Sequence, residues 1–101
     1  MNSVIVEFEG DVFRWTAREN DAWFFTALPV ELSEMIREIP RPYRGFGSVR
    51  VLARIGGSEW RTSIFPDSGG SYVLPLKRAV RDAEAIVDGG SVTVRLDVLD
   101  G

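Results

Sequence analysis

The stretch PDSGGSYVLPLK, residues 66–77, places two glycines before a lysine and raises the question of a phosphate-binding loop. Such a loop needs the pattern G-x-x-x-x-G-K-[ST] between a strand and a helix, so that backbone amides converge on the anion. Here Lys77 follows Gly70 by seven residues, and Arg78 stands where serine or threonine is required. The stretch therefore predicts a flexible connection between two strands and not a nucleotide site.

Groups for acid–base or nucleophilic catalysis are scarce. The chain has no cysteine and no histidine, which excludes disulfides, thiolate chemistry and imidazole catalysis. Carboxylates, Lys77, Tyr43 and Tyr72 remain as acids or bases. Ser63 or Ser71 could act as a nucleophile only beside an unusual base such as Lys77. We therefore assign no catalytic residue and expect the protein not to be an enzyme.

Three acids alternate near the N-terminus and could supply oxygen ligands to a hard cation: Glu7, Glu9 and Asp11. A bulge expected at Gly10–Asp11 would break this row. We therefore interpret the acids as solvated carboxylates and expect neither a metal nor a cofactor.

Arginine accounts for eleven of the twelve basic residues. Four arginines form a candidate binding site for an anion or a partner: Arg41, Arg44, Arg50 and Arg61. The first two precede a predicted β-hairpin, and the last two project from its outer face. In the alternative interpretation, Arg54 pairs with Glu59 and the other arginine stems cover apolar surface such as Leu52. We favour this alternative because nucleic-acid-binding domains usually carry a net positive charge, whereas this chain carries −3.

Length and composition define the class of protein. At 101 residues and 11.3 kDa the chain fits one domain over residues 1–101, and 45% apolar residues can supply its core. No apolar run approaches the roughly 18–20 residues of a membrane helix. The first residues include acids and lack the basic region of an export signal. We expect a soluble cytoplasmic protein without a membrane partner.

Alternation predicts the first two strands. Large apolar residues occupy every second position of residues 4–8, as in a strand with one buried face. Phe13 and Trp15 then fall out of phase, so we expect a bulge or bend at Gly10–Asp11 that returns them to the same face. Residues 22–28 are apolar on both faces and predict a strand that is covered on each side.

Two helices are predicted from apolar stripes. The first helix begins near Pro29, ends near Ile39 and carries the stripe Leu32, Met35, Ile36 and Ile39. The second helix has about three turns, ends at Gly89–Gly90 and carries the stripe Leu76, Val80, Ala83 and Val87.

The most specific local signal is a hairpin. Residues 48–55 and 58–65 alternate on either side of Gly56–Gly57, a dipeptide suited to a tight turn. A two-residue loop fixes five pairs: Ile55–Ser58, Arg54–Glu59, Ala53–Trp60, Leu52–Arg61 and Val51–Thr62. Opposite charges then meet outside, and a small residue makes room for an indole inside. Residues 71–74 and 91–99 predict two further strands.

Four segments, taken in order, carry a family resemblance: AWFFTALP, SVRVLARIGGSEWRTSIFP, GGSYVLPLKRAVRDA and DGGSVTVRLDVLD. They resemble a family of small bacterial barrel domains known as domain of unknown function 1905, over nearly the whole chain. The family commonly has Gly-Asp before its last strand, where this chain has Gly90–Ser91. The resemblance implies a closed or nearly closed β-barrel capped by helices; some relatives also carry a YdeI/OmpD-associated segment. The family brings no established catalytic residue.

Five aromatic residues could line a ligand pocket in such a barrel: Trp15, Trp23, Phe24, Phe25 and Trp60. Side chains normally fill the interior of a small barrel, so we expect these residues to be core. A residual cavity near a helical cap is the expected place for a small molecule.

The sequence thus predicts a mainly β fold, a small closed or nearly closed β-barrel of about six strands with two capping α-helices. We expect a non-catalytic binding or interaction module whose partner is unknown, with a protein and a small molecule as the candidates. A small-molecule-binding barrel is the first alternative, and a weak nucleic-acid-binding domain is the second.

Overall fold

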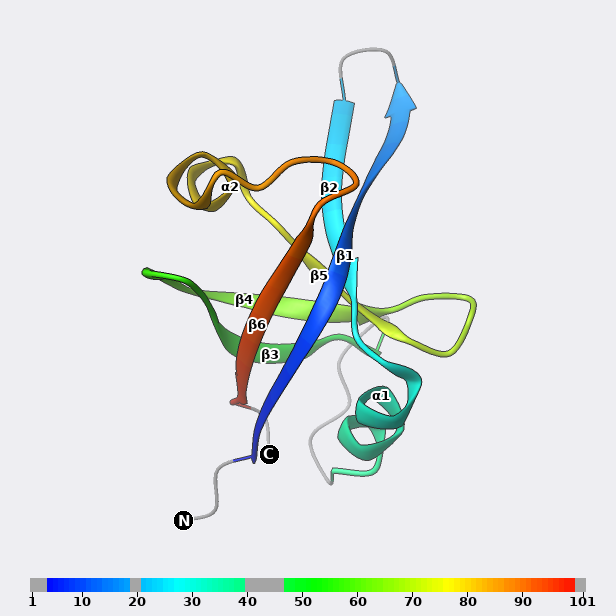
Figure 1. Ribbon diagram of the computed structural model, residues 1–101. Helices are drawn as coiled ribbons and strands as arrows, with labels where there is room; N and C mark the ends of the chain where they lie inside the picture. Colours follow the sequence, from blue (N-terminus) through cyan, green and yellow to red (C-terminus); the bar gives the residue numbers. More distant parts are fainter. Residues whose placement is uncertain (1–3, 19–20, 40–46, 100–101) are drawn as a thin grey trace.

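The computed structural model describes residues 4–18, 21–39 and 47–99, and for residues 16–18, 21 and 22 it describes the backbone alone. The strands are β1 (Val4–Arg18), β2 (Asp21–Ala27), β3 (Val49–Ile55), β4 (Ser58–Pro66), β5 (Tyr72–Pro75) and β6 (Ser91–Val98). They close into an antiparallel barrel in the order β1–β2–β5–β4–β3–β6 (Figure 1). The predicted closed barrel is confirmed.

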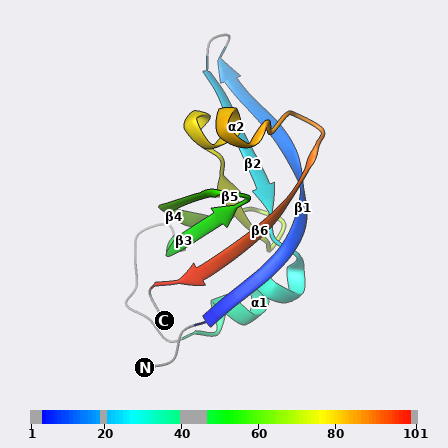
Figure 2. The ribbon, with the colours of Figure 1, turned by 60° about the vertical axis from the view of Figure 1, so that its left-hand side comes forward.

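Two helices, α1 (Val30–Arg37) and α2 (Arg78–Glu84), lie at opposite ends of the barrel (Figures 1 and 2). The predicted fold class, a mainly β barrel with two helices, is therefore confirmed. Across the described ranges, no helix has the length and apolar character needed to cross a membrane.

β1 runs past Gly10 without interruption, so the expected bulge at Gly10–Asp11 is wrong. Its register with β6 continues through the pair Asp11 and Ser91, and β1 then pairs with β2. A Cβ atom at Gly10 would collide with the Thr26 hydroxyl and would lie 3.2 Å from the carbonyl oxygen of Ala27. Because glycine has no Cβ, β1 can approach β2 closely while its side chains keep alternating.

The Gly56–Gly57 hairpin forms as predicted, and its register contains all five expected pairs. Gly56 adopts a φ of 58°, which suits the turn. Ala53 is fully buried opposite Trp60, which is 7% exposed, so the small side chain does make room for the indole. On the outer face, Arg54 Nη2 lies 3.6 Å from Glu59 Oε1.

α1 packs on the barrel through Ile36, which is fully buried. The predicted stripe is wrong at Met35, whose side chain is 42% exposed, whereas Leu32 and Ile39 are partly buried. Ser33 occupies the buried position instead, and its Oγ accepts a 3.0 Å hydrogen bond from the backbone N–H of Tyr72. This bond ties α1 to the start of β5.

α2 is shorter than the predicted three turns. It ends because Ala85 adopts a left-handed conformation with φ 54° and ψ 42°. Ala83 and Val87, which the sequence placed on a buried stripe, are exposed. Two backbone hydrogen bonds of 2.8 and 2.9 Å then join Val12 to the Gly89–Gly90 turn. The chain must therefore leave the helix early to reach β1 and enter β6.

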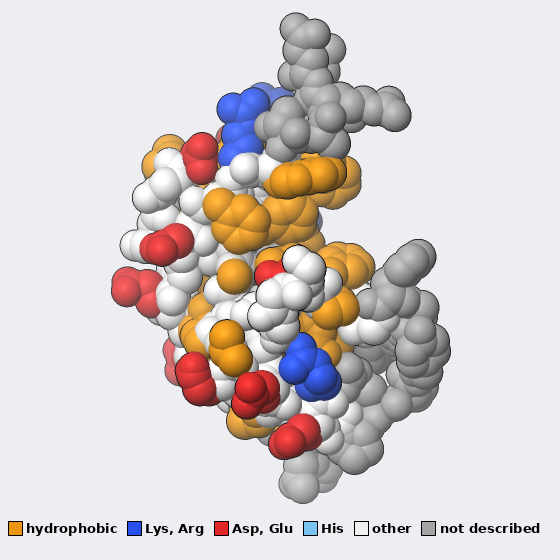
Figure 3. Space-filling view, turned by 90° about the vertical axis from the view of Figure 1, so that its right-hand side faces the viewer, with side chains coloured by type: hydrophobic (Ala, Val, Ile, Leu, Met, Phe, Trp, Pro, Cys, Tyr) orange, Lys and Arg blue, Asp and Glu red, His pale blue; other side chains and the backbone are white. Residues whose placement is uncertain are grey.

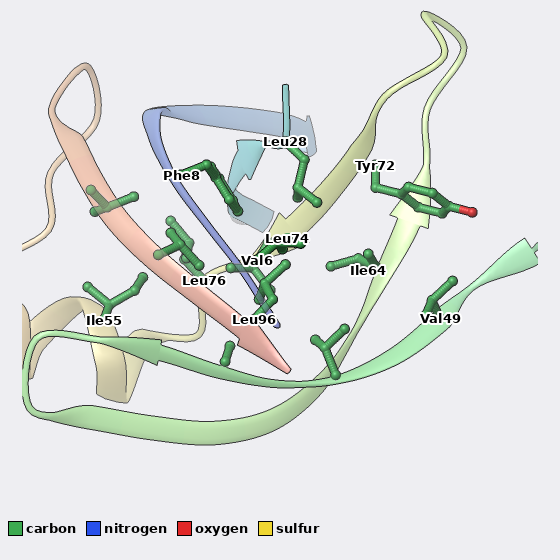
Figure 4. Close-up of a cluster of buried hydrophobic side chains, with 14 of the residues drawn as sticks. Val6, Phe8, Leu28, Val49, Ile55, Ile64, Tyr72, Leu74, Leu76 and Leu96 are labelled. Carbon is green, nitrogen blue, oxygen red and sulfur yellow. The ribbon is translucent and has the colours of Figure 1, made fainter. Parts of the chain in front are cut away.

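Side chains from β1, β3, β4, β5 and β6 point into the barrel and fill its interior (Figure 4). Large fully buried side chains include Tyr72, Leu28, Ile36, Ile64, Leu74 and Leu96. Every second residue of β3 and β6 is buried, which is the alternation expected of barrel strands. The interior is therefore a packed core.

Ala85→Gly is expected to raise the free energy of unfolding by about 1 kcal/mol, because glycine adopts the left-handed conformation without the Cβ penalty. Ala83→Gly is the matched control within α2 and should lower it by up to about 1 kcal/mol. Urea denaturation measures both. Equal losses in the two variants would mean that the helix continues through residue 85.

Candidate functional site

The four arginines of the candidate site divide into two groups. Arg41 and Arg44 lie outside the described residues. Arg50 and Arg61 lie on β3 and β4, and both side chains are exposed on the outer face of the hairpin. Arg50 is opposite Ser63, and Arg61 is opposite Leu52, so the two arginines occupy diagonal positions.

Acidic side chains flank a central pair of arginines on this outer face. The cross-strand register places Glu59, Arg54, Arg95 and Glu7 in one row over β4, β3, β6 and β1. A surface pocket of about 230 Å³ along this row is lined by Leu52, Arg54, Glu59, Arg95 and Asp97. Both signs of charge line the pocket, which gives little support to selective binding of an anion. Anion binding by the arginines stays a prediction.

The connection between β4 and β5 uses its polar groups internally. Asp67 Oδ1 accepts hydrogen bonds from the backbone N–H groups of Gly69, at 2.8 Å, and Ser71, at 3.0 Å. The N–H of Asp67 donates in turn to the carbonyl of Ser71 at 2.8 Å. These bonds explain why the Gly69–Gly70 segment forms a strand connection, as the sequence predicts, and does not converge on an anion.

The candidate catalytic groups are spread over the barrel. Lys77 is exposed at the N-terminus of α2. Ser71 precedes β5, so six residues of largely extended chain, about 20 Å, separate it from Lys77. Ser63 lies on β4 opposite Arg50. Tyr72 is buried, and Tyr43 lies outside the described residues.

The acids of β1 all lie on its exposed side. Glu7, Glu9 and Asp11 face Arg95, Thr93 and Ser91 of β6. Since β1 has no bulge at Gly10, the row is unbroken, with about 7 Å between successive positions. Within the part of the chain that the structure describes, no group of three or more acids, histidines or cysteines could hold a metal ion.

An exposed apolar surface lies on β1 and β2, where the sequence predicts core residues. Trp15 and Trp23 are each 55% exposed and Phe13 is 40% exposed, so the expectation that they are core is wrong. Trp60 is buried as expected, and Phe24 is partly buried. We call Phe13, Trp15, Trp23 and Phe25 the aromatic face. Hydrophobic side chains gather beside the β1–β2 hairpin in the space-filling view (Figure 3).

Strand register organises the aromatic face. Trp15 is directly opposite Trp23, and Phe13 is directly opposite Phe25, with ring centroids 5.8 Å apart and planes at 28°. Phe25 is in turn opposite Pro75 of β5. Such cross-strand aromatic pairs stabilise one another and hold the rings in fixed positions.

The same apolar surface continues over β5 and β4. Ala27 is opposite Val73, and Val73 is opposite Phe65, which is 40% exposed. The outer surface is therefore apolar across four neighbouring strands. On a monomer of this size, a contiguous patch of this kind is often functional.

The β1–β2 hairpin is held from behind by α2. The guanidinium of Arg81 lies 4.0 Å from the ring centroid of Phe24, on the side opposite the aromatic face. Arg81 Nε donates a 2.9 Å hydrogen bond to the carbonyl of Leu76, and the N–H of Leu76 donates a 2.8 Å bond to the carbonyl of Phe24. α2 therefore supports the hairpin on one side, and the aromatic face is exposed on the other side.

The sequence did contain a signal for this surface. Phe13 and Trp15 are out of phase with the buried Val12, and they keep that phase because β1 has no bulge at Gly10. A bulge would have shifted the alternation by one residue and returned both rings to the core, which is why the sequence favoured the core. The missing information was the continuous register at Gly10.

We expect the arginines of the outer face to give no more than weak, nonspecific nucleic-acid binding, because acids share that face. Fluorescence anisotropy of labelled single- and double-stranded oligonucleotides should give Kd values weaker than roughly 1 μM at physiological salt. The wild type and the Arg50→Ala/Arg61→Ala variant should behave alike. Tighter binding that is lost in the variant would establish nucleic-acid recognition by these arginines.

Comparison with known proteins confirms the resemblance. The model of the family described as Domain of unknown function (DUF1905) matches residues 8–96, from within β1 to within β6. No curated protein shows a significant match to the sequence. Because the family model covers most of the 101 residues, the chain belongs to the DUF1905 family.

Proposed function

We propose that this chain is a non-catalytic interaction module that binds a protein partner through the aromatic face. The observation that carries the proposal is the exposure of two tryptophans and a phenylalanine, Trp15, Trp23 and Phe13, on the paired strands β1 and β2. Tryptophan is among the residues that dominate binding energy in protein interfaces. No reaction is assigned to the chain, because the candidate catalytic groups are spread over the barrel.

The exposed apolar area of the aromatic residues is large enough to contribute to binding. A whole aromatic side chain contributes about 150–250 Å² when it is buried, so the exposed parts of Phe13, Trp15, Trp23 and Phe65 amount to roughly 400 Å². Removing that area from water would be worth roughly 10 kcal/mol before the costs of association. Because association itself costs several kcal/mol, only the surplus of this gain appears as binding energy.

The alternatives have less support. A small-molecule-binding barrel needs internal space, whereas side chains from five strands meet inside this one (Figure 4). A nucleic-acid-binding domain could stack bases on the aromatic face, but it would also need cations to hold the phosphates. The charged outer face mixes both signs, as described above. A protein partner is therefore our first choice.

The same proposal places the module in the cytoplasm of a bacterium. Small secreted domains commonly depend on disulfides, and this chain has no cysteine. The bacterial setting rests on the family resemblance.

Site-specific photocrosslinking tests the proposal. The photoreactive residue p-benzoylphenylalanine replaces Phe13 in one variant and Arg61 in a control variant, and each is irradiated in cells that naturally contain the protein. We expect the probe at position 13 to form protein adducts and the probe at position 61 to form few. Adding Trp15→Ser and Trp23→Ser should remove the adducts of position 13 without changing the fold, which circular dichroism verifies. Equal labelling from both positions, or adducts that persist in the tryptophan variant, would reject the proposal.

A further inference from the structure

We infer that the aromatic face is the contact surface of a homodimer, in which a second copy of this chain covers it. The inference rests on the proposed function and names its partner. Two features support it: opposite charges stand at two corners of the apolar surface, and the available area matches that of a weak dimer.

The acidic corner lies on β1. Asp11 is exposed, and it precedes Val12, which pairs with Thr26 of β2. By strand alternation, Asp11 therefore lies on the same side of β1 as Phe13, next to that ring and away from Trp15.

The basic corner lies at the end of β5. The N–H of Leu76 donates a 2.8 Å hydrogen bond to the carbonyl of Phe24, so the next residue, Lys77, lies beside Trp23. Leu76 is buried, and Lys77 is exposed with an extended backbone, φ −69° and ψ 157°. Lys77 therefore continues the outer side of β5 that Pro75 occupies.

Asp11 and Lys77 thus stand at diagonally opposite corners, with the aromatic face between them. Across the strands, from β1 over β2 to β5, they are two strand spacings apart. Along the strands they are four residue positions apart, so their separation is roughly 17 Å. A surface with a negative and a positive corner of this kind can complement itself.

A face that packs against its own copy needs a two-fold axis lying in the interface. A two-fold axis can pass through Phe25 and close to Trp15. It then crosses the line that joins Asp11 to Lys77. This axis brings Asp11 of each copy against Lys77 of the other, and Trp23 of each copy over Phe13 of the other. The Asp11–Lys77 ion pair and the Trp23–Phe13 contact then each occur twice in the interface.

The area fits a weak or transient dimer. Roughly 400–500 Å² of the aromatic face and its neighbours on β4 and β5 would be covered on each copy. Stable interfaces bury about 1,200–2,000 Å² in total, and weak or transient ones bury less. We therefore expect a dimer that dissociates at micromolar concentrations.

Sedimentation-velocity ultracentrifugation from about 1 to 300 μM tests the dimer. The wild type should change from monomer to dimer within this range, and Trp15→Ser/Trp23→Ser should remain monomeric. Asp11→Lys and Lys77→Asp should each weaken dimerisation by about tenfold or more, because like charges then meet twice in each interface. The double variant Asp11→Lys/Lys77→Asp restores both pairs, and its Kd should return to within about threefold of the wild type.

Glu34→Lys is the matched control, because it makes the same change of charge at an exposed position of α1. Its Kd should equal that of the wild type. Recovery in the double variant cannot arise from misfolding, since a misfolded chain would not regain the dimer.

A wild type that is monomeric throughout, or a dimer that ignores the charge exchange, would overturn the inference. If photocrosslinks from position 13 to a different protein still depended on the tryptophans, the interaction module would stand and only the second copy would be rejected. If those crosslinks were also independent of the tryptophans, both proposals would be rejected.

Discussion

Closure of the barrel depends on the close approach of β1 to β2 at Gly10. β1 is 15 residues long and pairs with two neighbours, with β6 through Asp11 and with β2 from Val12 onward. The space that a Cβ at Gly10 would need is taken by the hydroxyl of Thr26, which is fully buried. A side chain there would push the two strands apart at the place where the ring of strands closes. The absence of one methyl group thus allows a single strand to join both halves of the barrel.

The exposure of the aromatic face follows from the close approach of β1 to β2 at Gly10. Because the register of β1 continues through Gly10 without an extra residue, Val12 stays inside and Phe13 and Trp15 stay outside. β2 matches them with aromatic residues on the same side, and α2 supports the hairpin from the other side through Arg81. The result is an exposed apolar surface on a protein whose interior is already filled. Such a surface contributes little to the core, which is why we propose that a partner covers it.

Part of the fold and part of the candidate site could be predicted from the sequence, and the reasons differ from one element to the next. The hairpin at Gly56–Gly57 was predictable pair by pair, because a two-residue turn leaves one register. The end of α2 was not, because Ala85 is an unusual residue in the left-handed conformation and carries no sequence signal. Arg50 and Arg61 were correctly placed on an outer face, but the charges of β6 that complete this face are distant in sequence. The aromatic face was missed because hydrophobicity alone does not distinguish a core strand from an exposed one.

The most direct test of the contact at Gly10 is a double-mutant cycle measured by urea denaturation. Gly10→Ala should cost about 1–3 kcal/mol in the wild type, as expected for overpacking. In a Thr26→Ala background, which empties the space beside Gly10, the same substitution should cost at least about 1 kcal/mol less. In a Thr26→Val background, which keeps the branched side chain, the full cost should remain. Equal costs in all three backgrounds would contradict a close approach of β1 to β2 at this residue.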